Sequence, residues 1–353
     1  MSRATAASHL SAFLAKPGNA RLALLAGEAL LDTGEIDLAV ATWTLGDDAN
    51  AMVRRIKDNP NAPAEGRRRS RMADARLCEF LTRLHRHAVD AFEARTGATV
   101  ERVRRAVWPL THTSEVEFRT PMQRPVIFYM PELPAAPVEP NDAFAWVPTL
   151  ETACAEIRRE YDSGMQSGVD VRPYVPAETH AADWQDLRGS LDWSAIHLYH
   201  DSAATPMLAK FPRTRQALDA VDLARIDGTP MEAFFSRLKP GAHIPPHYGL
   251  TNTRVTVHLP LIVPDNCEIR VGRDLHPWRE GRIIAFDDSF EHEAWNRSAS
   301  DRVVLIFEAH HPGLSGQERA AIEHVFTVRQ RWLDSRLVRL QGWLTQAGSS
   351  IQI

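Results

Sequence analysis

Two stretches of the sequence decide the fold, PPHYGLTNTRVTVHLPL at residues 245–261 and FDDSFEHEAWNRSASDRVVLIFEAHHPG at residues 286–313. Each stretch combines a histidine beside a turn, His247 or His292, with a strand-like run that carries an arginine. The two histidines are 45 residues apart, which about four short strands with turns can span. Imidazole is the commonest metal ligand, and two imidazoles with open coordination positions suit Fe(II). The alternative is that both are ordinary surface or core residues, since the chain has 15 histidines.

Short runs with strand character follow one another at regular intervals after residue 230, separated by turns. The expected strands cover residues 232–239, 253–262, 266–271, 281–287, 291–296 and 302–310. Regular spacing of short strands is typical of a sandwich or barrel.

Alternate residues of a strand share a face, so polar residues of these runs collect on one side. Arg254, Thr256 and His258 share one face of their run, and Arg302 shares a face with Glu308. A buried polar row of this kind must be satisfied by partners, and Ser236 of the first strand would add to it. A small carboxylate ligand would serve, because an arginine fork matches a carboxylate in two parallel hydrogen bonds.

Composition excludes several classes of function. The net charge of −4 gives no reason to expect nucleic acid or an anionic membrane surface. The three cysteines are far apart, which indicates neither a zinc ribbon nor a disulfide framework. An N-terminal stretch interrupted by charged residues argues against a signal peptide, and no run reaches the ~18 apolar residues of a membrane span. We therefore expect a cytoplasmic protein without membrane or nucleic-acid partners.

The N-terminal third has the pattern of helices. Residues 6–45 resemble one helix-turn-helix of the tetratricopeptide type, which we expect to act as a cap or as a surface that pairs two copies in a homo-oligomer. The basic segment 60–72 is expected to be a solvated loop leading into an amphipathic helix over 73–97.

Dense prolines between residues 120 and 150 predict a linker or wrapping arm, which places a domain boundary near residue 125. Helices are expected at 150–164 and at 315–344, the second beginning with a capping box of Ser315 and Glu318. The expected domains are a helical region at 1–125 and a sheet domain at 126–353.

The pattern running from PGAHIPPHYGLTNTRVTVHLPL through FDDSFEHEAWN to RVVLIFEAHHP resembles the aspartyl/asparaginyl β-hydroxylase family. The resemblance spans roughly residues 190–313. It implies an α+β protein with a double-stranded β-helix core of the jelly-roll or cupin kind. It also implies an oxidoreductase that uses Fe(II), 2-oxoglutarate and O2 to hydroxylate a C–H bond of a peptide or small-molecule acceptor.

The same resemblance assigns roles to individual residues. His247 and His292 match the iron ligands, with no further catalytic residue implied. The remaining matches concern the cosubstrate 2-oxoglutarate: Arg302 and Ser236 at its distal carboxylate, His258 at the carboxylate near the iron, and Trp193 and Thr256 in the pocket wall. Arg254 is the candidate substrate contact.

Two positions depart from common patterns. Gly249 stands where most 2-oxoglutarate oxygenases carry the third, carboxylate ligand. The resembling family lacks that carboxylate too, so an open coordination site is expected, and a halogenase that places chloride there is a second reading. Thr256 stands where animal members have an arginine, which predicts an altered acceptor.

Two further alternatives concern function and the residues around His292. The first alternative is that the protein is a binding module rather than an enzyme, with a catalytically silent jelly roll and helices that recruit a partner. The second concerns Asp287 and Asp288, either of which is a candidate for the hydrogen-bond partner that orients the His292 ring. The alternative is that each is an ordinary turn residue. Glu291 and Glu293 are expected to point away from the site.

Overall fold

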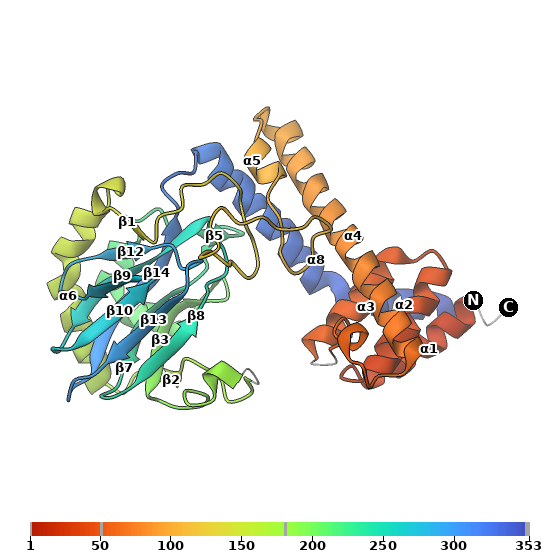
Figure 1. Cartoon of the computed structure of the whole chain (residues 1–353), viewed down its shortest axis with the longest axis horizontal. Helices are drawn as coiled ribbons and strands as arrows, with labels where there is room; N and C mark the ends of the chain where they lie inside the picture. Colours follow the sequence, from red (N-terminus) through yellow and green to blue (C-terminus); the bar gives the residue numbers. More distant parts are fainter. Residues whose placement is uncertain (1, 50–51, 180–181, 350–353) are drawn as a thin grey trace. The chain divides into compact units, whose positions relative to one another are not determined.

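Most strands pair into two antiparallel sheets that face one another, in a computed structural model that describes residues 2–49, 52–179 and 182–349 (Figure 1). The larger sheet has the strand order β1-β12-β9-β14-β7-β3-β2, with β4 paired to β3. The smaller sheet has the order β11-β10-β13-β8. Two facing sheets of antiparallel strands form the expected jelly-roll core, so the α+β assignment is confirmed.

All six predicted strands are present, with ends shifted by at most a few residues. The strands of the larger sheet are β1 (Val138–Glu139), β2 (Arg172–Pro173), β3 (Trp193–His200), β4 (Ala203–Ala204), β7 (Ala233–Leu238), β9 (Arg254–Ile262), β12 (Ile284–Phe286) and β14 (Arg302–His310). Those of the smaller sheet are β8 (His243–His247), β10 (Cys267–Val271), β11 (Asp274–Pro277) and β13 (His292–Asn296). A separate hairpin joins β5 (Arg225–Ile226) and β6 (Thr229–Pro230).

Strand β8 was not among the predicted strands, and it contains Pro245 and Pro246. Proline lacks the N–H that a central strand needs, and is tolerated only where one side of the strand has no partner. The structure satisfies this condition, because β8 forms the edge of the smaller sheet and pairs only with β13.

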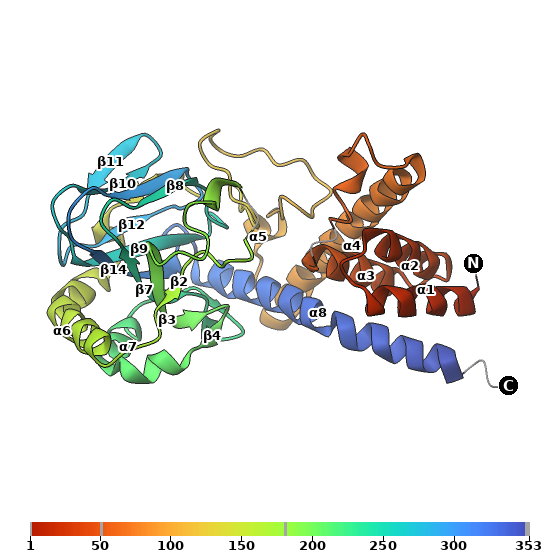
Figure 2. The same cartoon turned by 90° about the horizontal axis from the view of Figure 1, so that it is seen from below.

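The predicted alternation along β9 and β14 divides the core in two. Val255, Val257 and Leu259 face a cluster that includes residues of helix α6 (Val147–Gln166). Helix α6 covers the outer face of the larger sheet together with α7 (Pro212–Leu218) (Figure 2). The opposite faces of β9 and β14 turn toward the smaller sheet, so the polar row is enclosed between the two sheets.

The helical unit contains α1 (Arg3–Ala15), α2 (Ala20–Asp32), α3 (Ile36–Asp48) and α4 (Ala64–Thr96). Helices α2 and α3 form the expected helix-turn-helix. Trp43 lies against Gly27, where an added Cβ would fall 2.0 Å from the indole Nε1, so this close approach requires glycine. Smaller helical segments elsewhere in the chain are η1 (Ile56–Asp58), α5 (Glu101–Arg104), η2 (Asn141–Ala143), η3 (Ala182–Trp184) and η4 (Pro206–Lys210).

Residues 64–72 of the basic segment are helical, so the prediction of a loop over 60–72 is wrong for all but its first four residues. Helix α4 begins at Ala64 after Pro63, and Glu65 lies in its first turn, where a carboxylate is favoured. Arg68 and Arg69 pair with Glu65 and with Glu28 of α2, so neighbouring carboxylates balance the basic run.

The last helix, α8 (Gly316–Ser349), begins with the predicted capping box. The Ser315 backbone N–H donates to the Glu318 carboxylate at 2.9 Å, and the Glu318 N–H donates to the Ser315 hydroxyl at 3.2 Å. No helix in the described part of the chain combines the length and apolarity that crossing a membrane requires.

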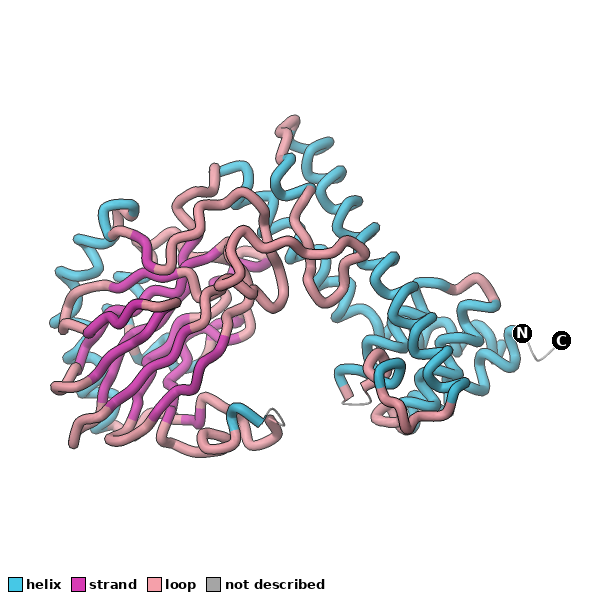
Figure 3. The backbone as a smooth tube through the Cα atoms, viewed as in Figure 1, coloured by secondary structure: helices cyan, strands magenta, loops and turns pink. Residues whose placement is uncertain are grey.

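The two units divide the chain differently from the boundary near residue 125. One unit comprises residues 1–98, 111–115 and 325–353, and the other comprises residues 99–110 and 116–324. Helix α8 therefore contributes to both units, because its buried tryptophans belong to the core of the helical unit. The segment before β1 is largely loop, as its prolines predict (Figure 3).

Candidate active site

Two histidines meet at the pairing of β8 with β13. His292 lies directly opposite His247 in the strand register, and the ring centroids are 4.0 Å apart. A β-bulge follows His292, and such irregularities re-aim side chains next to active sites. The structure thus brings together the two histidines that the sequence singled out.

Each of these imidazoles has one nitrogen engaged by the backbone. The Nδ1 of His247 lies 2.8 Å from the Pro245 carbonyl oxygen, and the Nδ1 of His292 lies 3.0 Å from that of Phe290. A carbonyl accepts only, so Nδ1 carries the proton and the Nε2 lone pair of each ring remains available. Burial lowers the pKa of His247, and lowers the pKa of His292 well below its usual range with His247 adding to the effect. Both rings are therefore neutral at pH 7, the form that binds metal.

Arg302 is buried in the same cavity without a counter-charge. Its side chain is 1% exposed, makes no ion pair with any carboxylate of the described residues, and has an Nε without a hydrogen-bond partner. Burial lowers the pKa of Arg302 to about 10, so it remains a cation at neutral pH. A buried, unpaired cation costs several kcal/mol unless an anion joins it. The donor set therefore fits a carboxylate ligand.

Ser236 and Trp193 position this arginine through a chain of two hydrogen bonds. The Trp193 indole Nε1 donates to the Ser236 hydroxyl oxygen at 3.1 Å, and an Arg302 Nη1 donates to the same oxygen at 3.3 Å. The Trp278 ring lies 4.6 Å from the guanidinium carbon and covers one of its faces. Trp193 lines the cavity, whereas Ser236 is fully buried and reaches it through Arg302.

His258 projects from β9 into the same cavity. It is 6% exposed, its Nδ1 has no hydrogen-bond partner, and burial lowers its pKa well below the usual range, with Arg302 adding to the effect. A neutral imidazole with an unsatisfied nitrogen requires a ligand atom or water.

The space over Gly249 is occupied by another part of the chain. A Cβ added at Gly249 would lie 2.0 Å from the Asp288 carboxyl carbon, so Asp288 fills the place of a side chain there. Within the described ranges, the only set of three metal-binding side chains with ligand atoms within 4.8 Å of one another is His197, His200 and Glu232. Asp288 therefore does not complete a ligand triad with His247 and His292.

Asp287 and Asp288 do not orient His292, contrary to that prediction. The Phe290 carbonyl takes this role. Asp287 instead accepts hydrogen bonds from the Gln123 amide and from the Ser289 backbone N–H, and Asp288 accepts one from the Thr256 hydroxyl at 2.9 Å.

The other polar residues of β9 face carboxylates. Thr256 lines the cavity beside Asp288. Arg254 is not among the lining residues, because its guanidinium pairs with Glu308 at 2.5 Å. Glu293 lines the cavity, contrary to its prediction as a residue pointing away from the site, and its carboxylate pairs with Arg270 and His243.

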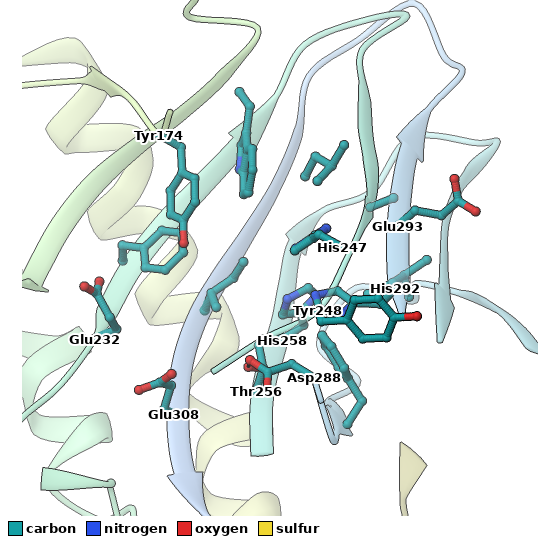
Figure 4. A pocket seen from close by; sticks show the side chains of 18 of the residues that line it. Tyr174, Glu232, His247, Tyr248, Thr256, His258, Asp288, His292, Glu293 and Glu308 are labelled. Atoms are coloured by element: carbon teal, nitrogen blue, oxygen red, sulfur yellow. Dashed lines mark hydrogen bonds between the residues drawn. The ribbon is translucent and has the colours of Figure 1, made fainter. Parts of the chain in front are cut away.

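The cavity between the sheets has a volume of about 320 Å³. Tyr174, Glu232 and Glu308 lie on one side in the view of Figure 4, and His247 and His292 on the other. Tyr174, Trp184 and Glu232 were not predicted as site residues, because only tertiary contacts bring them here. Glu308 had one signal, its position on the same strand face as Arg302.

Comparisons with known proteins identify a family model and several similar sequences. Residues 151–312 match the family model described as Aspartyl/Asparaginyl beta-hydroxylase. The chain is 31% identical over 214 residues to Aspartate beta-hydroxylase domain-containing protein 2 of Xenopus tropicalis, covering 59% of this chain and 56% of that protein. It is 34% identical over 212 residues to domain-containing protein 1 of Homo sapiens, covering 58% and 52%.

A third relative is longer than this chain. Aspartyl/asparaginyl beta-hydroxylase of Mus musculus is 34% identical over 141 residues, which cover 39% of this chain and 19% of that protein. The chain spans little more than half the length of the first two relatives.

Proposed function

Because residues 151–312 belong to the aspartyl/asparaginyl β-hydroxylase family, we propose that the protein is an Fe(II)- and 2-oxoglutarate-dependent hydroxylase. The observation that carries the proposal is the pairing, within one cavity, of two neutral imidazoles with free Nε2 atoms and one buried arginine without a counter-ion. The two imidazoles suit Fe(II), and the arginine suits a dicarboxylate cosubstrate.

Each residue has a distinct part in this proposal. His247 and His292 would hold the iron, and the Pro245 and Phe290 carbonyls would keep each ring in the metal-binding tautomer. Arg302, held in place by the hydrogen bonds of Ser236, would bind the distal carboxylate of 2-oxoglutarate.

Other side chains shape the remainder of the cavity. His258, in the tautomer whose N–H faces the ligand, would donate to the carboxylate of 2-oxoglutarate near the iron. The apolar walls from Trp184, Trp193 and Ile306 would exclude bulk water. The chemistry that Fe(II) and 2-oxoglutarate supply when bound is the activation of O2 toward an unactivated C–H bond.

The acceptor proposed from the relatives' names is the β-carbon of an aspartyl or asparaginyl residue, or a related peptide or small molecule. A halogenase is the weaker candidate, because the Asp288 carboxyl group occupies the space over Gly249 and would oppose a chloride ion. A silent binding module is also weaker, because it gives no reason to bury Arg302 without a partner.

The test is anaerobic addition of Fe(II) and 2-oxoglutarate to the purified protein, with visible absorption as the readout. We expect a metal-to-ligand charge-transfer band in the wild type that is lost in His292→Ala. His243→Ala is the matched control, because His243 lies on β8, the strand paired with that of His292, and its ring pairs with Glu293. Absence of the band in wild-type protein that is folded by circular dichroism would refute the proposal.

A further inference from the structure

One side of the cavity carries negatively charged side chains that have no role in binding iron or 2-oxoglutarate in the proposal above. The charged lining residues are four carboxylates, Glu232, Asp288, Glu293 and Glu308, and one cation, Arg302. Glu293 is balanced by Arg270 at 2.5 Å, on the side away from the cavity. The cation is already committed to the cosubstrate, so the carboxylates of the opposite side require another explanation.

The remaining three carboxylates are only partly compensated by the protein. Glu308 pairs with the guanidinium of Arg254. Asp288 accepts a hydrogen bond from the uncharged Thr256 hydroxyl. One oxygen of Glu232 accepts from the His200 ring, whose Nδ1 is 2.9 Å away, and from the Asp201 backbone N–H at 3.3 Å.

The second oxygen of Glu232 is buried and has no hydrogen-bond partner, with the His197 Nδ1 at 3.5 Å. A buried carboxylate oxygen without a donor is costly unless a ligand or water provides one.

These carboxylates lie close enough to oppose one another's ionisation. Burial raises the pKa of Asp288 to about 7, and the Glu308 and Asp287 charges add to this effect. Burial also raises the pKa of Glu308, with Glu232 adding and Arg254 opposing. A positive charge placed between them would relieve this repulsion.

Aromatic rings stand beside the carboxylates. Tyr174 stacks on Trp193 with ring centroids 3.9 Å apart and lies 5.1 Å from Phe234. All three rings line the cavity, and Figure 4 shows Tyr174 next to Glu232. Aromatic faces together with carboxylates are a combination that binds amines and guanidinium groups.

We infer that the acceptor of this enzyme carries a cationic group, an amine or a guanidinium, which binds among Glu232, Asp288, Glu308 and the ring of Tyr174 while the carbon to be hydroxylated faces the histidine pair. This inference rests on the proposed function, since it names the substrate class of the same site. Among the acceptors proposed there, it favours a related peptide or small molecule that carries a cation over an aspartyl residue. An acceptor with a carboxylate at this position would meet like charges at close range and bind weakly.

The test compares matched acceptors that differ in charge. Free arginine, citrulline and aspartate, and acetylated and amidated Ala-X-Ala peptides that contain them, are titrated into the full-length protein with Fe(II) and 2-oxoglutarate under anaerobic conditions. Arginine and citrulline have nearly the same shape, so their difference isolates the charge. Binding is measured by calorimetry, and succinate formation is measured after O2 is admitted.

We expect an arginine probe to bind about tenfold or more tightly than its citrulline counterpart, because a charged group left without its partner is strongly penalised. Glu232→Gln should reduce this ratio several-fold, and Asp288→Asn provides a second, independent variant. Glu268→Gln should leave the ratio unchanged, because Glu268 pairs with the exposed Arg297 and does not line the cavity.

The two proposals fail in different ways. If 2-oxoglutarate gives neither heat nor an absorption band, the proposed function fails and this inference falls with it. If 2-oxoglutarate binds but arginine probes bind no better than citrulline probes, or if aspartate probes bind best, the inference alone is overturned.

Discussion

Replacing Gly249 with alanine should destabilise the protein, although alanine is the smallest side chain that can be added. Gly249 does not have a positive φ, so backbone strain is not the reason. The new Cβ would lie 2.0 Å from the Asp288 carboxyl carbon and 2.2 Å from each of its oxygens, distances that no stable structure retains. The Asp288 side chain must therefore leave its position and lose its hydrogen bond from Thr256.

The size of the effect follows from these contacts. Loss of a hydrogen bond to a charged group costs roughly 1.5–3 kcal/mol. Forcing a side chain off its rotamer adds about 0.5–1.5 kcal/mol. The reduced entropy of the unfolded chain returns about 0.4–1 kcal/mol when alanine replaces glycine. The expected net loss in the free energy of unfolding is about 2 kcal/mol, which lowers the melting temperature by roughly 4–8 °C.

The assay is scanning calorimetry at pH 7, following the transition of the unit that contains residue 249. Gly316→Ala is the matched control in the same unit, since no atom would lie within 4 Å of the added Cβ. We expect its melting temperature to stay the same or rise slightly. The double variant Gly249→Ala/Asp288→Ala should lose less than the sum of the two single variants, because the clash is absent.

A Gly249→Ala protein as stable as the wild type, or strict additivity in the double variant, would refute the reasoning. If the reasoning holds, an aspartate introduced at position 249 cannot simply restore a third metal ligand, because the Asp288 carboxyl already fills that space.

Three other predictions can be tested with standard methods. Arg302→Lys should weaken 2-oxoglutarate binding about tenfold or more in an anaerobic titration, because lysine lacks the planar fork of two donors, and an unchanged dissociation constant would contradict the role of this residue. Affinity for an arginine probe should rise between pH 6 and pH 8. Asp288, whose pKa is raised to about 7, is neutral below that pH and anionic above it. An arginine affinity that depends on pH no more than the citrulline affinity does would contradict this prediction. Ser315→Ala should reduce the free energy of unfolding by about 1 kcal/mol in urea denaturation, because the capping box is lost. An unchanged urea midpoint would contradict this prediction.

The period-two alternation of β9 and β14 was sufficient to predict the faces of the larger sheet. The apolar residues of β9 lie in the core beneath α6, while Thr256 and His258 line the cavity. This prediction succeeded because a strand that is buried on both faces still separates its side chains strictly by parity. The capping box of α8 was equally readable, because it depends on residues only three apart.

Secondary-structure prediction from local sequence failed where contacts with distant residues stabilise a structure that the local residues do not favour. Strand β8, which contains two prolines, was absent from the predicted strands, and the basic run of α4 was predicted to be a loop. An edge position tolerates the prolines, and the carboxylates of Glu28 and Glu65 balance the basic run. Neither compensation can be seen within the segment itself.

The sequence by itself determined the sheet domain, the pair His247 and His292, and the buried arginine, since each depends on residue type and short-range spacing. Only the tertiary structure decided what surrounds them. Tyr174, Glu232, Asp288 and Glu308 come from distant parts of the chain and share one cavity because strand order and register place them there. The charge of a binding site is the sum over side chains that meet across strands, and their distances are fixed only when the sheets pair.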